Sequence, residues 1–115
     1  IVSEKIQVPV ETSPLLRERY FGSWDGTSSS NYDQVWTQDQ IDATHCLKGV
    51  ESVQSVAERM TEFIRFLDAA DREKSYLIVS HGDPLQILLA AFAGMDLRLH
   101  RTISPIGTGE LRTLA

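Results

Sequence analysis

Residues 76–84 read Tyr-Leu-Ile-Val-Ser-His-Gly-Asp-Pro, and the rest of the chain is interpreted around them. The run 76–79 is apolar without alternation, which is typical of a strand buried on both faces of a largely parallel sheet. The Gly-Asp-Pro that follows suits a tight turn, a helix cap and the first turn of a helix. We therefore predict a strand, a sharp turn and a helix. His81 would then lie at the carboxyl edge of the sheet, beside free helix amides that attract anions.

The segments on either side of this stretch complete an alternation of helix and strand. Apolar residues recur at spacings of three and four from about Ser52 to Ala70, which predicts an amphipathic helix. A second, almost wholly apolar helix is predicted over 84–93, and Gly94 ends it. A helix that leads into an apolar strand and then into another helix is typical of a doubly wound α/β sheet.

The remaining segments are patterned more weakly. Residues 1–12 alternate in part but contain a proline, so we predict a short extended segment at a sheet edge, and 110–115 predict a final strand. Residues 23–47 are mostly polar and predict a long loop that contains one short helix over 30–38. Loops of this length in a compact domain are usually lids or binding walls. The two tryptophans in this loop could line a pocket, but packing is the commoner use of tryptophan.

Composition narrows the class of protein. The 115 residues suffice for a single domain, 1–115, with ordinary apolar (42%) and charged (23%) content. A net charge of -5 without a basic cluster argues against nucleic acid, and no apolar run is long enough to indicate a membrane span. The single cysteine, Cys46, excludes an internal disulfide and favours a reducing, cytoplasmic location. His45 beside it does not amount to a metal site, so we expect no metal and no organic cofactor.

A carboxylate flanked by two arginines stands at residues 17–19, beside leucines and aromatics. Between two guanidinium groups Glu18 would be held ionised unless burial opposed them. The alternative is a surface strip of salt bridges with little energetic weight. His81 has a comparable alternative, since a lone histidine at a strand end is often a structural boundary residue. Neither position by itself indicates a function.

Three segments occur together in one order, and the ordered set is more specific than any one of them. They are Leu-Arg-Glu-Arg-Tyr-Phe-Gly-Ser-Trp-Asp-Gly at 16–26, Gly-Val-Glu-Ser at 49–52 heading a helix, and Val-Ser-His-Gly at 79–82. In this order the chain resembles the histidine phosphatase superfamily, the phosphoglycerate-mutase-like phosphatases, over about 16–94. The resemblance implies an α/β fold of three layers, a mostly parallel sheet with helices on both faces.

The resemblance also implies roles for particular residues. In that family a nucleophilic histidine, within an Arg-His-Gly triplet at the end of the first strand, takes a phosphoryl group from the substrate. By position in the motifs, Glu18 matches the proton donor to the leaving oxygen, and Arg19 matches its substrate-side neighbour. His81 matches the second histidine of the phosphate pocket, and Gly82 supplies a close amide. The implied partner is a small phosphorylated substrate, bound without metal or cofactor.

One part of the family pattern has no counterpart in the chain. None of its three histidines stands in an Arg-His-Gly triplet, only 15 residues precede Leu16, and the first residue is Ile1. We therefore expect the chain to be the C-terminal portion of such a domain, incomplete at the N-terminus. The nucleophile and a central strand would lie in a preceding segment or in a partner chain, so we expect either a complementing N-terminal segment or a homo-oligomer.

Two hypotheses from different classes follow. The first is a phosphatase of phosphomonoesters that works through a phosphohistidine intermediate. We prefer a phosphatase to a mutase because the insertion at 23–48 is short for a mutase of this family. The second is a non-catalytic, degenerate or truncated scaffold that binds a protein or a phosphorylated ligand. A serine hydrolase of another kind is less suited, because Ser80 lacks the GxSxG elbow of a serine nucleophile.

Overall fold

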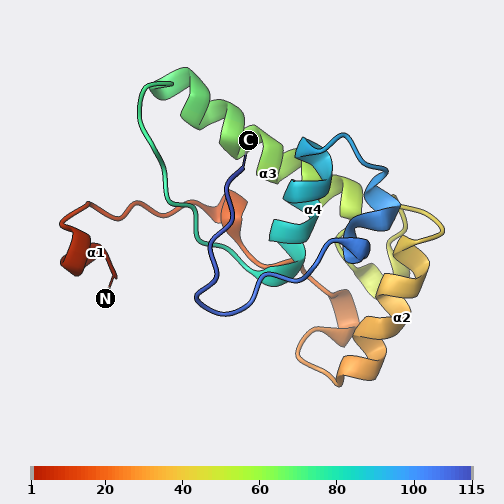
Figure 1. The fold of residues 1–115 in the computed structure, drawn as a ribbon. Coiled ribbons are helices and arrows are strands. Elements are labelled where there is room, and N and C mark those ends of the chain that lie inside the picture. Colours follow the sequence, from red (N-terminus) through yellow and green to blue (C-terminus); the bar gives the residue numbers. More distant parts are fainter. Residues whose placement is uncertain (1, 115) are drawn as a thin grey trace.

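The computed structural model describes residues 2–114. Its α-helices are α1 Val2–Ile6, α2 Ser29–Asp39, α3 Val53–Ala70 and α4 Gly82–Phe92. Its 3-10 helices are η1 Pro14–Leu16, η2 Gly22–Trp24, η3 Leu47–Gly49 and η4 Leu97–Thr102. In Figure 1 α3 packs against α4, with α2 and η4 gathered on one side and α1 standing away on the other.

The largest apolar cluster lies between α3 and α4. The predicted helix over about 52–70 is confirmed: the Ser52 side chain accepts the Ser55 amide at 3.1 Å and so caps α3. One stripe of α3 faces α4, and the buried members of the cluster are Val53, Val56, Ala57, Met60, Ile87 and Leu88. Burying larger side chains of this kind contributes about 1.5–3 kcal/mol each, so this contact fixes α4 on α3.

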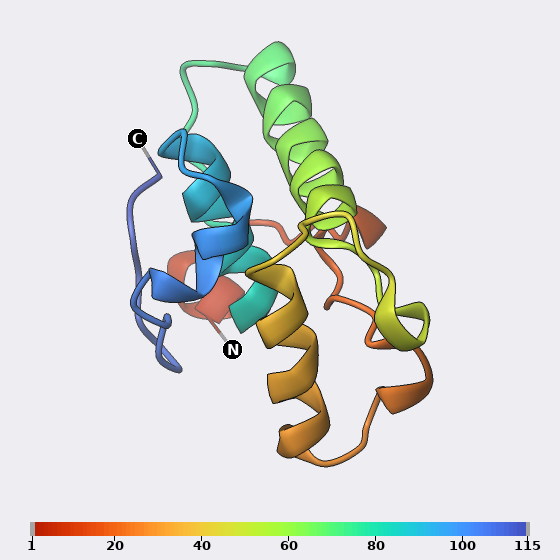
Figure 2. The same ribbon diagram turned by 90° about the vertical axis from the view of Figure 1, so that its right-hand side faces the viewer.

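Helix α2 confirms the short helix expected within the polar loop, and a second apolar cluster lies beneath it. Phe21, Val35 and Val50 are its buried residues, with Trp24, Tyr32, Trp36 and Leu47 packed around them. The rings of Phe21 and Tyr32 stack with centroids 4.3 Å apart. Both tryptophans therefore pack, as one of the two interpretations held. In Figure 2 α2 lies below the end of α3 and next to the start of α4.

Backbone approach fixes the identity of Gly22 in this second cluster. Its φ is +60°, and a Cβ there would lie 2.0 Å from the Lys48 carbonyl oxygen. Glycine alone combines that dihedral with that clearance. The turn of η2 is thereby pressed against η3, and this contact places the segment 17–21 that precedes it.

Helix α4 begins two residues earlier than predicted, and it ends as predicted at Gly94. His81 has extended backbone dihedrals, φ −121° and ψ 165°, and α4 starts at the next residue. At the other end, Gly94 adopts φ +67°, and the Met95 amide donates to the Ala90 carbonyl at 3.0 Å. This is the bond of a Schellman motif, which closes a helix through a left-handed glycine.

The predicted strands do not form within residues 2–114. Residues 76–79 are irregular backbone rather than a strand buried on both faces, with Leu77 56% and Val79 76% exposed. No backbone hydrogen bond joins 76–80 to other described residues. A strand is stable only when a neighbour satisfies its ladder groups, and no neighbour is present in this part of the chain.

The same correction applies at both ends of the chain. Val2–Ile6 is a short helix instead of an extended edge, and it stops where Gln7 takes φ 55°. Residues 110–114 are irregular instead of a strand, while Ile1 and Ala115 lie outside the described residues. None of the helices in residues 2–114 combines the length and apolarity needed to span a bilayer.

Candidate active site

The structure brings two of the predicted residues together at the start of α4. The Nδ1 atom of His81 lies 3.7 Å from the Oε2 atom of Glu18. Both side chains are open to solvent, 54% and 47% exposed, so a ligand in water reaches them without any movement of the chain. The Ser80 hydroxyl donates to the Leu16 carbonyl at 2.7 Å and ties the two segments together beside this pair.

Gly82 occupies the first position of α4, directly beside His81. The first amides of a helix have no acceptor within the helix, and together they carry the positive end of its dipole. Gly82 is exposed, and a Cβ built on it would meet nothing within 4 Å. The start of α4 therefore offers an accessible amide for an anion, next to the pair of Glu18 and His81.

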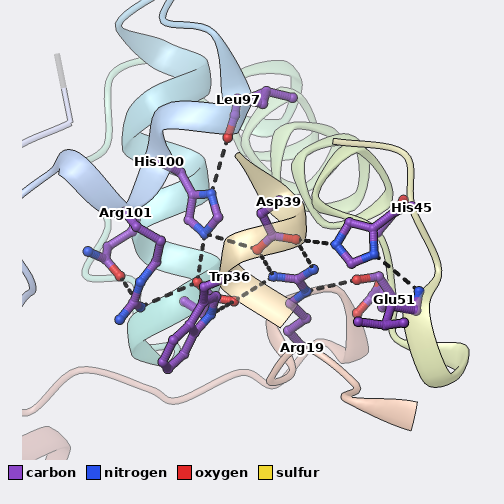
Figure 3. Close-up of polar contacts among 12 residues, drawn as sticks. Arg19, Trp36, Asp39, His45, Glu51, Leu97, His100 and Arg101 are labelled. Carbon is purple, nitrogen blue, oxygen red and sulfur yellow. Dashed lines mark hydrogen bonds and ion pairs between the residues drawn. The ribbon is translucent and has the colours of Figure 1, made fainter. Parts of the chain in front are cut away.

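Arg19, the fourth predicted residue, points away from this surface into the protein. Its guanidinium is fully buried and pairs with both carboxylate oxygens of Asp39, at 2.7 and 2.8 Å. It also donates to Asp83 at 3.0 Å and, through Nε, to the Glu51 carbonyl at 2.8 Å. Figure 3 shows Asp39 and Glu51 beside the Arg19 guanidinium. A direct contact between Arg19 and substrate stays a prediction.

The two carboxylates around Arg19 also bind histidine rings: Asp39 binds His45, and Asp83 binds His100. The Leu47 amide donates to Nδ1 of His45, so the other nitrogen carries the hydrogen that binds Asp39 at 2.6 Å. In His100 both nitrogens face acceptors, the Asp83 carboxylate at 2.9 Å and a backbone carbonyl at 3.1 Å. Arg19, Asp39, Asp83 and His100 thus form one buried cluster of polar contacts.

Asp83 is held ionised by this cluster. Burial acts to raise the pKa of its carboxyl, but the hydrogen bond from His100 and the charge of Arg19 outweigh it and lower the pKa to about 2. Because the folded-state pKa lies below the ordinary 3.8, the stabilisation is complete above about pH 4 and is lost as the pH falls through about 2. Asp83 is thus an anion throughout the neutral range, and its side chain is turned inward rather than toward a bound phosphate.

A second buried arginine supports the segment that carries Glu18. Arg59 of α3 donates to the Leu15 carbonyl at 2.7 Å and to the Glu18 carbonyl at 3.4 Å, and it pairs with Glu51 at 2.8 Å. Burial acts to raise the pKa of Glu51, but the hydrogen bond and charge of Arg59 lower it overall. The backbone of residues 15–18 is therefore fixed to α3.

Sequence reasoning found the exposed pair and missed the residues beneath it. Asp39, Arg59 and His100 were not predicted to take part, and Asp83 was interpreted as a helix cap. His100 is fully buried. The only signal in the sequence was the run of charged residues at 17–19, which does not name partners on other elements. Across residues 2–114, no group of three or more His, Cys, Asp or Glu side chains is placed to hold a metal ion.

Comparisons with known proteins agree on the family. The model of the histidine phosphatase superfamily (branch 1) matches residues 1–114. The chain is 30% identical over 97 residues to the adenosylcobalamin/alpha-ribazole phosphatase of Escherichia coli (strain K12). This match covers 77% of the chain and 46% of that phosphatase.

Solved structures resemble the chain in fold. Mycobacterial hydrolase 2 superposes with a TM-score of 0.78 at 24% identity, over 92% of this chain and 51% of the other. A mycobacterial glucosyl-3-phosphoglycerate phosphatase superposes with a TM-score of 0.75 at 24% identity, over 92% and 56%. The chain thus spans about half the length of the relatives that it matches. With the family model matched over 1–114, the chain belongs to the histidine phosphatase superfamily, branch 1.

Proposed function

We propose that the full-length protein carrying these residues is a phosphatase that hydrolyses small phosphomonoesters at the start of α4. The observation that carries the proposal is the 3.7 Å approach of His81 to Glu18, two exposed side chains from distant parts of the sequence. An imidazole that can donate a hydrogen bond to phosphate oxygens and an acid that can protonate a leaving oxygen are thereby adjacent. The phosphatase relatives support the reaction class at the level of the family.

The reaction divides between residues in this chain and a nucleophile outside it. A histidine that does not belong to these 115 residues attacks phosphorus, and the ester P–O bond breaks as a P–N bond forms. Glu18 gives its proton to the departing alkoxide, and His81 and the Gly82 amide hold the phosphoryl oxygens as they gain charge. Glu18 then takes a proton from water, which restores the acid. The water oxygen bonds to phosphorus as the P–N bond breaks, and inorganic phosphate and the free histidine are released.

The local electrostatics suit both steps. The Glu18 Oε1 atom accepts the Arg19 amide at 2.8 Å, which holds the carboxyl in one orientation. A bound phosphate brings negative charge to the exposed carboxyl and so favours its protonated form, the form that the first step requires. Arg19 and Asp83 nearly neutralise each other beneath, so the anion meets the positive end of α4 without a bare carboxylate below it.

The rest of the fold is proposed to come from chain outside these residues. Leu77 and Val79 are exposed, and a groove of 530 Å³ beside Leu77 and Ile78 is lined mainly by apolar side chains of α3, α4 and the C-terminal segment. A strand laid beside 76–80 would supply the missing ladder bonds and complete the parallel sheet of the expected α/β fold. A complementing N-terminal segment fits this better than a homo-oligomer, because the relatives are about twice as long as the chain.

The proposed final acceptor of the phosphoryl group is water rather than a second sugar or acid, because the loop 23–48 leaves little chain to enclose a second substrate. The location is cytoplasmic, in keeping with the single exposed thiol of Cys46.

Turnover of p-nitrophenyl phosphate tests the proposal. We expect the full-length protein to hydrolyse it, His81→Ala to lower kcat/KM by about 100-fold, and the 115-residue chain alone to be inactive. Turnover by the 115 residues alone would overturn the external nucleophile. If the full-length protein bound inorganic phosphate but did not turn over the ester, the result would support the non-catalytic binding module instead of the phosphatase.

A further inference from the structure

Three contacts join the segment around Glu18 to the segment around His81. The Ser80 hydroxyl binds the Leu16 carbonyl at 2.7 Å, the side chains of Glu18 and His81 approach to 3.7 Å, and Arg19 binds Asp83 at 3.0 Å. The first and last lie on either side of the exposed pair. They differ in that only the contact between Arg19 and Asp83 is both fully charged and buried.

The exposed pair cannot set its own geometry. Both of its side chains are about half exposed, and an ion pair in that setting is worth little because water screens it. Their separation must therefore come from the backbone that carries them. Glu18 directly precedes Arg19, and His81 stands two residues before Asp83, so the buried ion pair is a fixed point close to both.

Each member of the buried pair is itself fixed by other elements. Arg19 is held by the end of α2 through Asp39 and by the Glu51 carbonyl before α3. Asp83 accepts from His100 of η4 at 2.9 Å and from the Trp36 indole at 3.4 Å. Both members are therefore held by α2 and its neighbours, and the contact between them resists a change in spacing.

We propose that Arg19 and Asp83 are a positioning pair that sets the distance between Glu18 and His81. The proposal rests on the proposed function in one respect, that these two groups act on the same phosphate. Arg19 then acts through Glu18 rather than by touching substrate. When this pair is weakened, Glu18 and His81 separate while the helices stay folded.

Asp83→Asn and Asp39→Asn in the full-length protein form a matched test. Both remove one buried carboxylate from the same guanidinium. In each carboxylate both oxygens accept hydrogen bonds, whereas the amide of asparagine offers one acceptor oxygen. Only Asp83 lies on the segment of His81. The measurement is the ratio of kcat/KM for p-nitrophenyl phosphate to that for phenyl phosphate, which cancels any loss of folded protein.

We expect Asp83→Asn to raise this ratio about 10-fold, because a misplaced acid harms the poorer leaving group more. Asp39→Asn should leave it near the wild-type value. Equal ratios in the two variants would overturn the positioning role. If Asp83→Asn does not fold, Asp83→Glu keeps the charge and lengthens the link by one methylene group, and it should raise the ratio as well.

A second readout needs no turnover and so separates the two proposals. In the wild type and in Asp39→Asn, Glu18→Gln should shift the NMR resonances of the His81 ring, because a charge 3.7 Å away is removed. In Asp83→Asn this shift should be largely lost. A shift of the same size in all three backgrounds would contradict the positioning pair, whereas absent turnover with the expected shifts would count against the phosphatase alone.

Discussion

Glu18→Gln is expected to slow the full-length protein on phenyl phosphate by about 100-fold or more, and on p-nitrophenyl phosphate by far less. The amide keeps the size of the side chain and cannot give a proton to the leaving oxygen. Phenolate is the poorer leaving group and needs that proton, whereas nitrophenolate departs as a stable anion. Steady-state kinetics with the two esters, compared as kcat/KM, provide the measurement.

A control variant separates this effect from a general loss of negative charge. Glu73 is an exposed carboxylate in the turn after α3, and Glu73→Gln should leave both rates near those of the wild type. Equal losses on the two esters in Glu18→Gln would mean that Glu18 does not act as the acid.

Arg19→Met is expected to destabilise the protein by about 3–5 kcal/mol, because it removes the buried guanidinium that binds both Asp39 and Asp83. Folded proteins are commonly stable by only about 5–15 kcal/mol, so much of the protein should unfold under mild conditions. The reciprocal pKa effect points the same way: burial acts to lower the pKa of Arg19, but Asp39 and Asp83 raise it overall. Urea unfolding followed by circular dichroism measures the change.

Arg98→Met is the matched control for this substitution. Arg98 also binds a carboxylate, that of Asp96 at 2.6 Å, but the pair lies on the surface, where ion pairs contribute little. Its unfolding midpoint should stay close to that of the wild type. An Arg19→Met midpoint equally unchanged would show that the buried cluster does not depend on its guanidinium.

Helices α3 and α4 could be predicted because their signals are local. The stripe of apolar residues and the Ser52 cap define α3, and Gly94 ends α4, without reference to the rest of the chain. The strand over 76–79 could not be settled in the same way. Its apolar run describes a surface that needs neighbours, and the described residues contain none that pair with it.

The candidate site divides along the same line. Glu18 and His81 were recognised because each belongs to a short motif, and the ordered motifs resemble a family. The cluster beneath them joins Arg19 to partners 20 and 64 positions away, and Asp83 to His100 17 positions away. Only tertiary packing creates such contacts, so a pattern read along the sequence carries no trace of them.

A crystal structure of the full-length protein with bound vanadate, a mimic of the transferring phosphoryl group, would test the central claim most directly. The account predicts that vanadate lies at the start of α4, with the His81 ring, the Gly82 amide and the Glu18 carboxyl all within hydrogen-bonding distance of its oxygens. Vanadate bound elsewhere, with Glu18 and His81 both turned away from it, would contradict the account.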